Sequence, residues 1–181
     1  MKKTLVVLFI LNLGCGKTQN SAETTDSKTE TDISNKVTGA YLLENEKVAY
    51  SFLTRSNKRL MIAMDKSEKY LVYRYGSEDK VELEFPSDKT NSWSQFAYHR
   101  YTRPAPESMT NLSLSFTIGD FTYSVYDNTS EGENDAGEHV SSHECGININ
   151  RDRSNIDIEG LLETRVGSLW DLESIEKLPK R

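Results

Sequence analysis

The chain has 181 residues, of which 36% are hydrophobic and 28% are charged, and its formal net charge is −6. This length fits one ordinary domain. An acidic chain with no basic stripe gains nothing from the release of phosphate counterions, so we expect no nucleic acid among its partners.

The N-terminus has the layout of a signal peptide. Lys2 and Lys3 precede an apolar run over residues 4–13. A charged start followed by a short apolar run is typical of export signals, and a bilayer span would need about 20 apolar residues. We therefore expect residues 1–14 to be a bacterial-type signal peptide, the alternative being a buried N-terminal strand.

Gly14 and Cys15 end the apolar run. The pair resembles the lipobox of bacterial lipoproteins, in which a small residue precedes the cysteine that becomes the lipidated first residue. Asn12 stands where that motif usually has leucine, so cleavage without lipidation stays open. The resemblance implies acyl chains such as palmitate on Cys15, and each buried methylene stabilises membrane binding by about 0.8 kcal/mol. We expect a lipid-anchored protein of the cell envelope, periplasmic or surface-exposed.

Residues 16–36 are almost entirely polar. Such a segment cannot bury enough apolar surface to offset its ordering entropy, so we expect a disordered tether over residues 15–36 and a folded domain over residues 37–181.

The first part of that domain alternates apolar and polar residues with a period of two, which predicts β-strands. In the last of these strands Val81, Leu83 and Phe85 face one way and the glutamates between them face the other. One buried and one wet face indicate an antiparallel sheet. The expected strands are residues 47–53, 60–64, 70–75 and 81–85.

A hairpin is predicted over residues 112–126. Gly119-Asp120 suits a two-residue type II′ turn. Folding about it pairs Ile118 with Phe121, and the alternation then places the apolar side chains of both strands on one face. The further pairs expected are Phe116 with Tyr123 and Leu114 with Val125.

The remaining segments complete an all-β prediction. We expect a strand over residues 93–101, a surface loop over residues 128–138 and a last hairpin from residues 146–149 and 156–158. Ser168 to Asp171 reads as a capping box for a short helix that Pro179 ends. The fold expected is a single antiparallel β-sandwich or barrel of about eight to ten strands with one short C-terminal helix.

Two segments carry a resemblance. Residues 70–76 read YLVYRYG and residues 81–86 read VELEFP. This strand pair resembles a family of small exported bacterial proteins. The family has no established activity, so the resemblance implies no catalytic residue. It also implies a disulfide at positions where this chain has Met61 and Gly160.

His139, His143 and Cys145 form the one metal-like cluster in the sequence. On an extended chain they project to one side, and their side chains suit zinc, with Asp135 or Glu138 as a fourth ligand. The alternative is a polar loop that enters a strand, with Cys145 a small buried residue.

The same segment could hold a cysteine nucleophile. Cys145 would be activated by His99, His139 or His143, which would make the protein a metal- or thiol-dependent hydrolase. No protease signature surrounds Cys145.

Arg74 lies within an aromatic strand. It either pairs with Glu82 or Glu84 on the next strand, or belongs to a recognition patch of aromatic side chains. The glutamates themselves could form an acid pair, although a solvated strand face is the commoner reading. The aromatic residues of the patch would be Tyr70, Tyr73, Tyr75, Trp93, Tyr98 and Tyr101.

The sequence thus leads to a non-enzymatic binding or structural module of the envelope. Its partners would be the membrane, through the lipid, and an envelope protein, and we expect no cofactor. The alternatives are a secreted inhibitor of a lysozyme-like enzyme and the hydrolase described above.

Overall fold

The computed structural model describes residues 40–181, so the expected signal peptide, Cys15 and the tether lie outside the described residues. Nine antiparallel strands form one sheet in the order β4-β3-β2-β1-β9-β8-β7-β6-β5. The antiparallel all-β prediction is confirmed. The strands are β1 (Glu46–Thr54), β2 (Arg59–Asp65), β3 (Leu71–Ser77), β4 (Lys80–Phe85), β5 (Ala97–Arg103), β6 (Met109–Ile118), β7 (Phe121–Glu133), β8 (His139–Arg151) and β9 (Ser154–Gly167).

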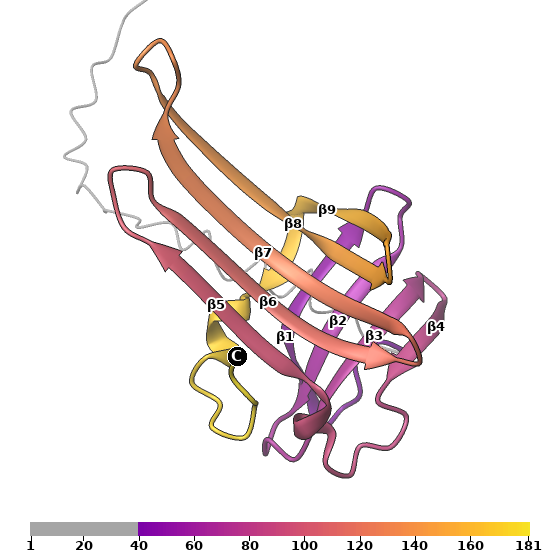
Figure 1. Ribbon diagram of the computed structural model, residues 1–181. Coiled ribbons are helices and arrows are strands. Elements are labelled where there is room, and N and C mark those ends of the chain that lie inside the picture. The colour runs from indigo at the N-terminus through magenta and orange to yellow at the C-terminus, as the bar shows by residue number, and fades with distance from the viewer. Residues whose placement is uncertain (1–39) are drawn as a thin grey trace, which may run out of the picture. The chain divides into compact units, whose positions relative to one another are not determined.

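β9 joins two layers of this sheet. Its first half, up to Glu159, pairs with β8, and its second half, from Gly160 to Gly167, pairs with β1. The sheet therefore curls on itself, and β5–β8 cross in front of β1–β4 (Figure 1). β4 and β5 are the two edges of the sheet and do not pair with each other. The domain is thus an open, curled sheet and not a closed barrel.

The core lies between the two layers. Alternate residues of each strand point inward, as the period of two requires. Phe116 stacks against Phe85 and Tyr123, with ring centroids 4.4 and 5.1 Å apart. Tyr50 and Phe52 of β1 belong to the same core and are fully buried. Each such burial contributes about 1.5–3 kcal/mol relative to an exposed side chain.

The predicted hairpin of residues 112–126 is confirmed pair by pair. Ile118 pairs with Phe121, and the register continues through Phe116–Tyr123 and Leu114–Val125. Gly119 has a φ of 58°, which the first position of a type II′ turn requires.

The C-terminal segment differs from the helix expected. Leu169–Leu172 form one 3₁₀ turn, and Ser168 caps it by accepting a hydrogen bond from the backbone N–H of Trp170 at 3.1 Å. Leu172, Ile175 and Leu178 then enter the core as the chain crosses the end of the sheet. Within residues 40–181 no helix is long and apolar enough to cross a membrane.

The chain ends along the edge strand β5. The backbone N–H of Tyr98 donates to the carbonyl of Pro179 at 2.8 Å, and the N–H of Arg181 donates to the carbonyl of Tyr98 at 2.9 Å. The C-terminus thereby satisfies part of an edge that would otherwise stay open for pairing.

Two expectations about local structure are wrong. Residues 92–95 form a 3₁₀ turn, so the predicted strand over residues 93–101 begins only at Ala97. Residues 128–133 belong to β7, and only residues 134–138 form a loop. β7 and β8 therefore make a long hairpin that extends beyond the layer of β1–β4 (Figure 1).

Candidate functional site

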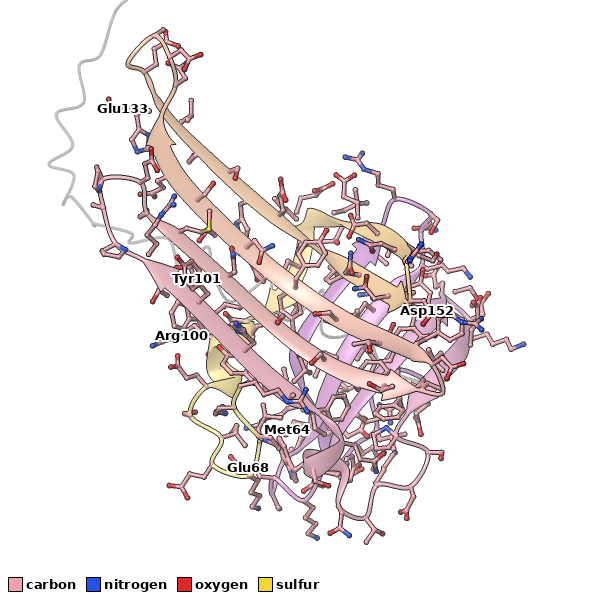
Figure 2. The ribbon with its side chains drawn as sticks, in the orientation of Figure 1. Met64, Glu68, Arg100, Tyr101, Glu133 and Asp152 are labelled. Carbon is pink, nitrogen blue, oxygen red and sulfur yellow. The ribbon has the colours of Figure 1, made fainter. Side chains whose placement is uncertain are left out.

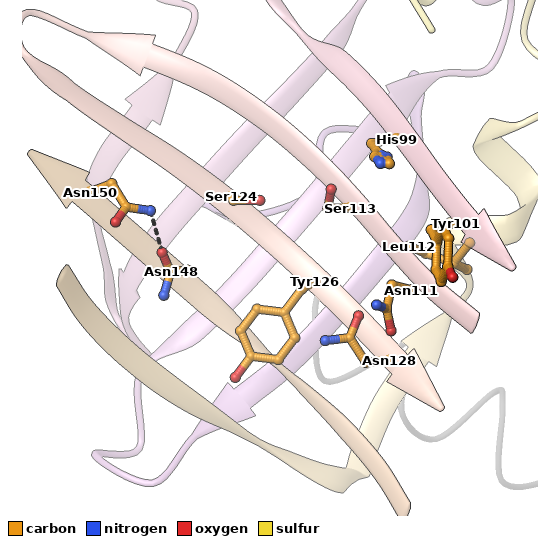
Figure 3. Close-up of a pocket in the computed structure, with 10 residues that line it drawn as sticks. All are labelled: His99, Tyr101, Asn111, Leu112, Ser113, Ser124, Tyr126, Asn128, Asn148 and Asn150. Carbon is orange, nitrogen blue, oxygen red and sulfur yellow. Dashed lines mark hydrogen bonds between the residues drawn. The ribbon is translucent and has the colours of Figure 1, made fainter. Parts of the chain in front are cut away.

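The outward face of β5–β8 carries the candidate site. Strand pairing places outward side chains in rows across the four strands. One row runs from His99 through Ser113 and Tyr126 to Gly146. A shallow hollow of about 600 Å³ lies over these rows (Figure 3). Its lining residues are His99, Tyr101, Asn111, Leu112, Ser113, Ser124, Tyr126, Asn128, Asn148 and Asn150.

The lining is polar, and His99 is its one basic side chain. No Asp, Glu, Lys or Arg is among the residues that line it, although such residues make up 28% of the chain. Carboxamides supply both donors and acceptors, and hydroxyls can act as either. The hollow can therefore form many hydrogen bonds, and the carboxylate of Asp157 lies at its border, bonded to the hydroxyl of Tyr126.

Tyr126 lies flat on the sheet. An added Cβ at Gly146, its neighbour on β8, would lie 2.7 Å from Cζ of the Tyr126 ring. The ring therefore crosses β8 where that strand has no side chain, and its hydroxyl donates to Oδ2 of Asp157 on β9 at 3.2 Å. Figure 3 shows the ring face-on from outside the molecule. One aromatic face is thus presented to whatever occupies the hollow.

Several lining groups have unused hydrogen-bonding capacity. Nδ2 of Asn150 donates to Oδ1 of Asn148 at 2.5 Å. Within residues 40–181, the side chains of Ser113, Ser124 and Asn128 make no hydrogen bond to other protein groups. These three are half-buried, so their polar groups still reach the surface.

A second polar cluster lies on the inward face, where β7, β8 and β9 meet. Arg165 donates through Nη1 to Oδ2 of Asp127 at 2.9 Å, and Nε2 of His143 lies 2.6 Å from Oδ1 of the same carboxylate. Asp127 is only 5% exposed. The arginine and the histidine compensate a carboxylate that would be costly to bury alone.

The structure does not assemble the predicted metal site. His143 and Cys145 share the inward face of β8, but His139 pairs with Glu133 at the far end of the hairpin. No group of three His, Cys, Asp or Glu side chains in the described part of the chain could hold a metal ion.

The thiol of Cys145 is free, and the side chain is 1% exposed. Burial raises the pKa of this thiol to about 11. Since the thiolate is the nucleophile, and His143 contacts Asp127, the geometry gives no support to a cysteine hydrolase.

The buried hydroxyl of Tyr50 belongs to the same region. It makes no hydrogen bond within residues 40–181. Burial, followed by the charge of Asp127, raises the pKa of this phenol.

Arg74 is structural. It donates through Nη1 and Nη2 to the two carboxylate oxygens of Glu46 at 2.6 and 2.9 Å, and through Nε to Glu84 at 2.6 Å. The expected partner Glu84 is thus found, and Glu46 at the start of β1 is a second partner that binds the guanidinium through two hydrogen bonds. Glu82 instead binds Lys58 at 2.6 Å on the surface, so the two glutamates face different partners and do not act as an acid pair.

The recognition patch predicted around Arg74 is wrong for most of its members. Arg74, Tyr73, Trp93 and Tyr98 are each at most 6% exposed. Tyr75 is half-buried and packs against the core. Of the aromatic residues expected there, Tyr101 reaches the hollow and is 49% exposed.

The asparagines of the hollow were not among the residues predicted from the sequence. Polar side chains at every second position of residues 113–124 indicated a wet face. That signal did not show that β5 and β8 continue the same face, which depends on strand order. Compared with known protein families, curated proteins and solved structures, the chain finds no match.

Proposed function

We propose that this protein is an exported, lipid-anchored module of a bacterial envelope that binds its partner without catalysis, through the hollow on β5–β8. The observation that carries the proposal is the lining of that hollow: carboxamides and hydroxyls around a flat tyrosine ring, with no Asp, Glu, Lys or Arg. A rigid sheet holds these groups in place, which lowers the entropic cost of binding.

A charge placed in the hollow tests this function. Full-length protein carrying Ser113→Arg should capture less material from envelope extract than the unmodified protein, because a long cation fills the lined surface. Ser67→Arg is the matched control, since Ser67 is exposed in the β2–β3 turn. Equal capture by both variants would show that the hollow is not the binding face.

The anchor is tested separately. Protein extracted from membranes should carry acyl chains on Cys15, measured by mass spectrometry of the N-terminal peptide. Cys15→Ala should move the protein into the soluble fraction. An unmodified N-terminus in the membrane-extracted protein would overturn the lipid anchor and leave the binding face untouched.

Inhibition of a lysozyme-like enzyme is a second candidate, favoured by the long β7–β8 hairpin. Its tip carries Glu131, Glu133, Asp135 and Glu138, and no Lys or Arg occurs over residues 128–150. Figure 2 shows Glu133 at the far end of the hairpin. An acidic projection suits a positively charged cleft.

Lysis assays with several lysozyme types test this candidate. Inhibition by the protein should disappear when the four tip carboxylates are replaced by their amides. Ser113→Arg should leave the inhibition unchanged. Absence of inhibition for every lysozyme would remove the candidate.

A further inference from the structure

We infer that the hollow on β5–β8 binds an uncharged oligosaccharide. The inference rests on the proposed function, because it names the chemical class of ligand for the same face. It goes beyond that function by making the ligand a glycan and by assigning the central contact to the ring of Tyr126.

The lack of Asp, Glu, Lys and Arg in the lining argues against an ionic ligand. Without Lys or Arg, the hollow has no group that neutralises a phosphate, a sulfate or a carboxylate. No Asp or Glu lines it, and the neighbouring carboxylate of Asp157 already accepts the hydroxyl of Tyr126. In the described part of the chain, no group of three His, Cys, Asp or Glu side chains could hold a metal ion. An acidic ligand would lose its hydration there with only the imidazole of His99 in return and with the carboxylate of Asp157 nearby.

The hollow is also a poor site for an apolar ligand. Leu112 is the one aliphatic residue that lines it, and its side chain is 2% exposed because it points into the core. A lipid or a hydrophobic peptide would bury the carboxamide of Asn128 and the hydroxyls of Ser113 and Ser124 without partners. Each unpaired group would cost about 1–3 kcal/mol.

An uncharged oligosaccharide brings no ionic group into the hollow and can form hydrogen bonds with its lining. Each sugar hydroxyl donates and accepts hydrogen bonds, as carboxamide and hydroxyl side chains do. Neighbouring strands lie about 4.8 Å apart, and alternate residues of one strand about 7 Å apart. The polar groups of the rows therefore form a flat grid on the scale of a sugar ring, which suits an extended chain of such rings.

Tyr126 supplies a stacking surface inside this grid. A pyranose ring has an apolar C–H face, and an aromatic ring laid flat can pack against it. Tyr126 is laid flat because Gly146 leaves room beneath it and because Asp157 holds its hydroxyl. Tyr101 stands at the margin of the hollow, beside Asn111 (Figure 3). The position of Gly146 opposite Tyr126 is thus the feature that turns a polar sheet face into a stacking platform.

Titrations of the full-length protein test the inference. The probes are chitotetraose, which is N-acetylated, maltotetraose, which is not, and a heparin tetrasaccharide as the acidic comparison. A shallow site predicts a Kd on the order of 10 μM to 1 mM for a neutral probe. Binding is measured by NMR from the shifts of backbone amides in β6, β7 and β8. The two neutral probes distinguish an acetamido-sugar polymer from a plain glucan.

Substitutions at Tyr126 separate stacking from hydrogen bonding. Tyr126→Ala should weaken binding of the neutral probe about tenfold, the upper end of one stacking contact. Tyr126→Phe keeps the ring and should stay within about threefold of the unmodified protein. Asn128→Ala, which should weaken binding without touching the ring, is a second variant if Tyr126→Ala fails to fold. Trp170→Ala removes an exposed aromatic ring outside the hollow and should change nothing.

The inference is overturned if neither neutral probe binds, if the heparin probe binds this face more tightly, or if Tyr126→Ala binds as well as the unmodified protein. The proposed function would survive any of these results as long as Ser113→Arg still lowers capture from envelope extract. Loss of that effect as well would show that the face has no binding role.

Discussion

Arg74 on β3 and Glu46 at the start of β1 form a two-point ion pair inside the protein, with N–O distances of 2.6 and 2.9 Å. Their side chains are 1% and 0% exposed. The same guanidinium donates to the carbonyl of Tyr41 at 2.8 Å. The pair therefore ties the segment before β1 to the sheet, through charges that water cannot reach.

Removing one member of this pair should be costly. Glu46→Gln leaves the Arg74 charge buried without its main partner, and we expect it to lower the free energy of unfolding by about 3–5 kcal/mol. Glu84→Gln is the control, since that side chain is 36% exposed, and should cost about 1 kcal/mol or less. Urea denaturation measures both, and equal losses would contradict a special role for Glu46.

The same carboxylate should make stability fall in acid. Burial alone would raise the pKa of Glu46, but hydrogen bonds from Arg74 and Leu43, together with the Arg74 charge, hold the pKa below its ordinary value of 4.5. A carboxyl whose pKa is lowered by folding stabilises the protein above its unfolded pKa, and this contribution is lost as pH falls through the folded pKa.

We therefore expect the free energy of unfolding to decrease as pH drops below about 4.5. Glu46→Gln should reduce the slope of that decrease, because the titrating group is gone. Urea titrations at a series of pH values give the two slopes, and identical slopes would assign the acid sensitivity to other carboxyls.

Two glycines should respond oppositely to alanine. At Gly76 an added Cβ would lie 2.6 Å from the backbone nitrogen of Glu82 and would also clash with the carbonyl oxygen of Lys80. Gly76→Ala should destabilise by about 1–3 kcal/mol. At Gly132 the nearest atom would be 3.8 Å away, so Gly132→Ala should stabilise by about 0.5–1 kcal/mol. Thermal unfolding of the pair checks both signs, and a loss of stability at Gly132 would contradict the open surroundings.

Cys145 should be inert in the native protein. Its thiol is buried, and with a pKa raised to about 11 it is almost entirely protonated at neutral pH. We expect iodoacetamide to leave Cys145 unmodified until denaturant is added. Peptide mapping by mass spectrometry distinguishes modification of Cys145 from modification of Cys15. Rapid alkylation of the folded protein would instead reveal an accessible thiolate.

Some segments of the chain were predictable from the sequence and others were not, for a physical reason. The hairpin around Gly119 was predictable because its turn and its alternation lie within a few residues of each other. Residues 128–133 resembled a loop because none of their side chains is apolar, so the apolar signal of a strand is missing. Trp93 and Phe96 fit a strand by composition, but the chain turns there between the sheet edges β4 and β5.

The candidate site also has features that were predictable from the sequence and features that were not. Period-two patterning already predicts an antiparallel sheet with a wet face, because burial of one side of a strand is a local property. The partners of Arg74 and the lining of the hollow come from residues far apart in the chain. Glu46 reaches Arg74 only because β1 and β3 flank β2, and His99, Ser113, Tyr126 and Gly146 form one row only because β5–β8 are neighbours in register. Strand order and register are set by packing of the whole core, so only the folded chain brings these side chains together.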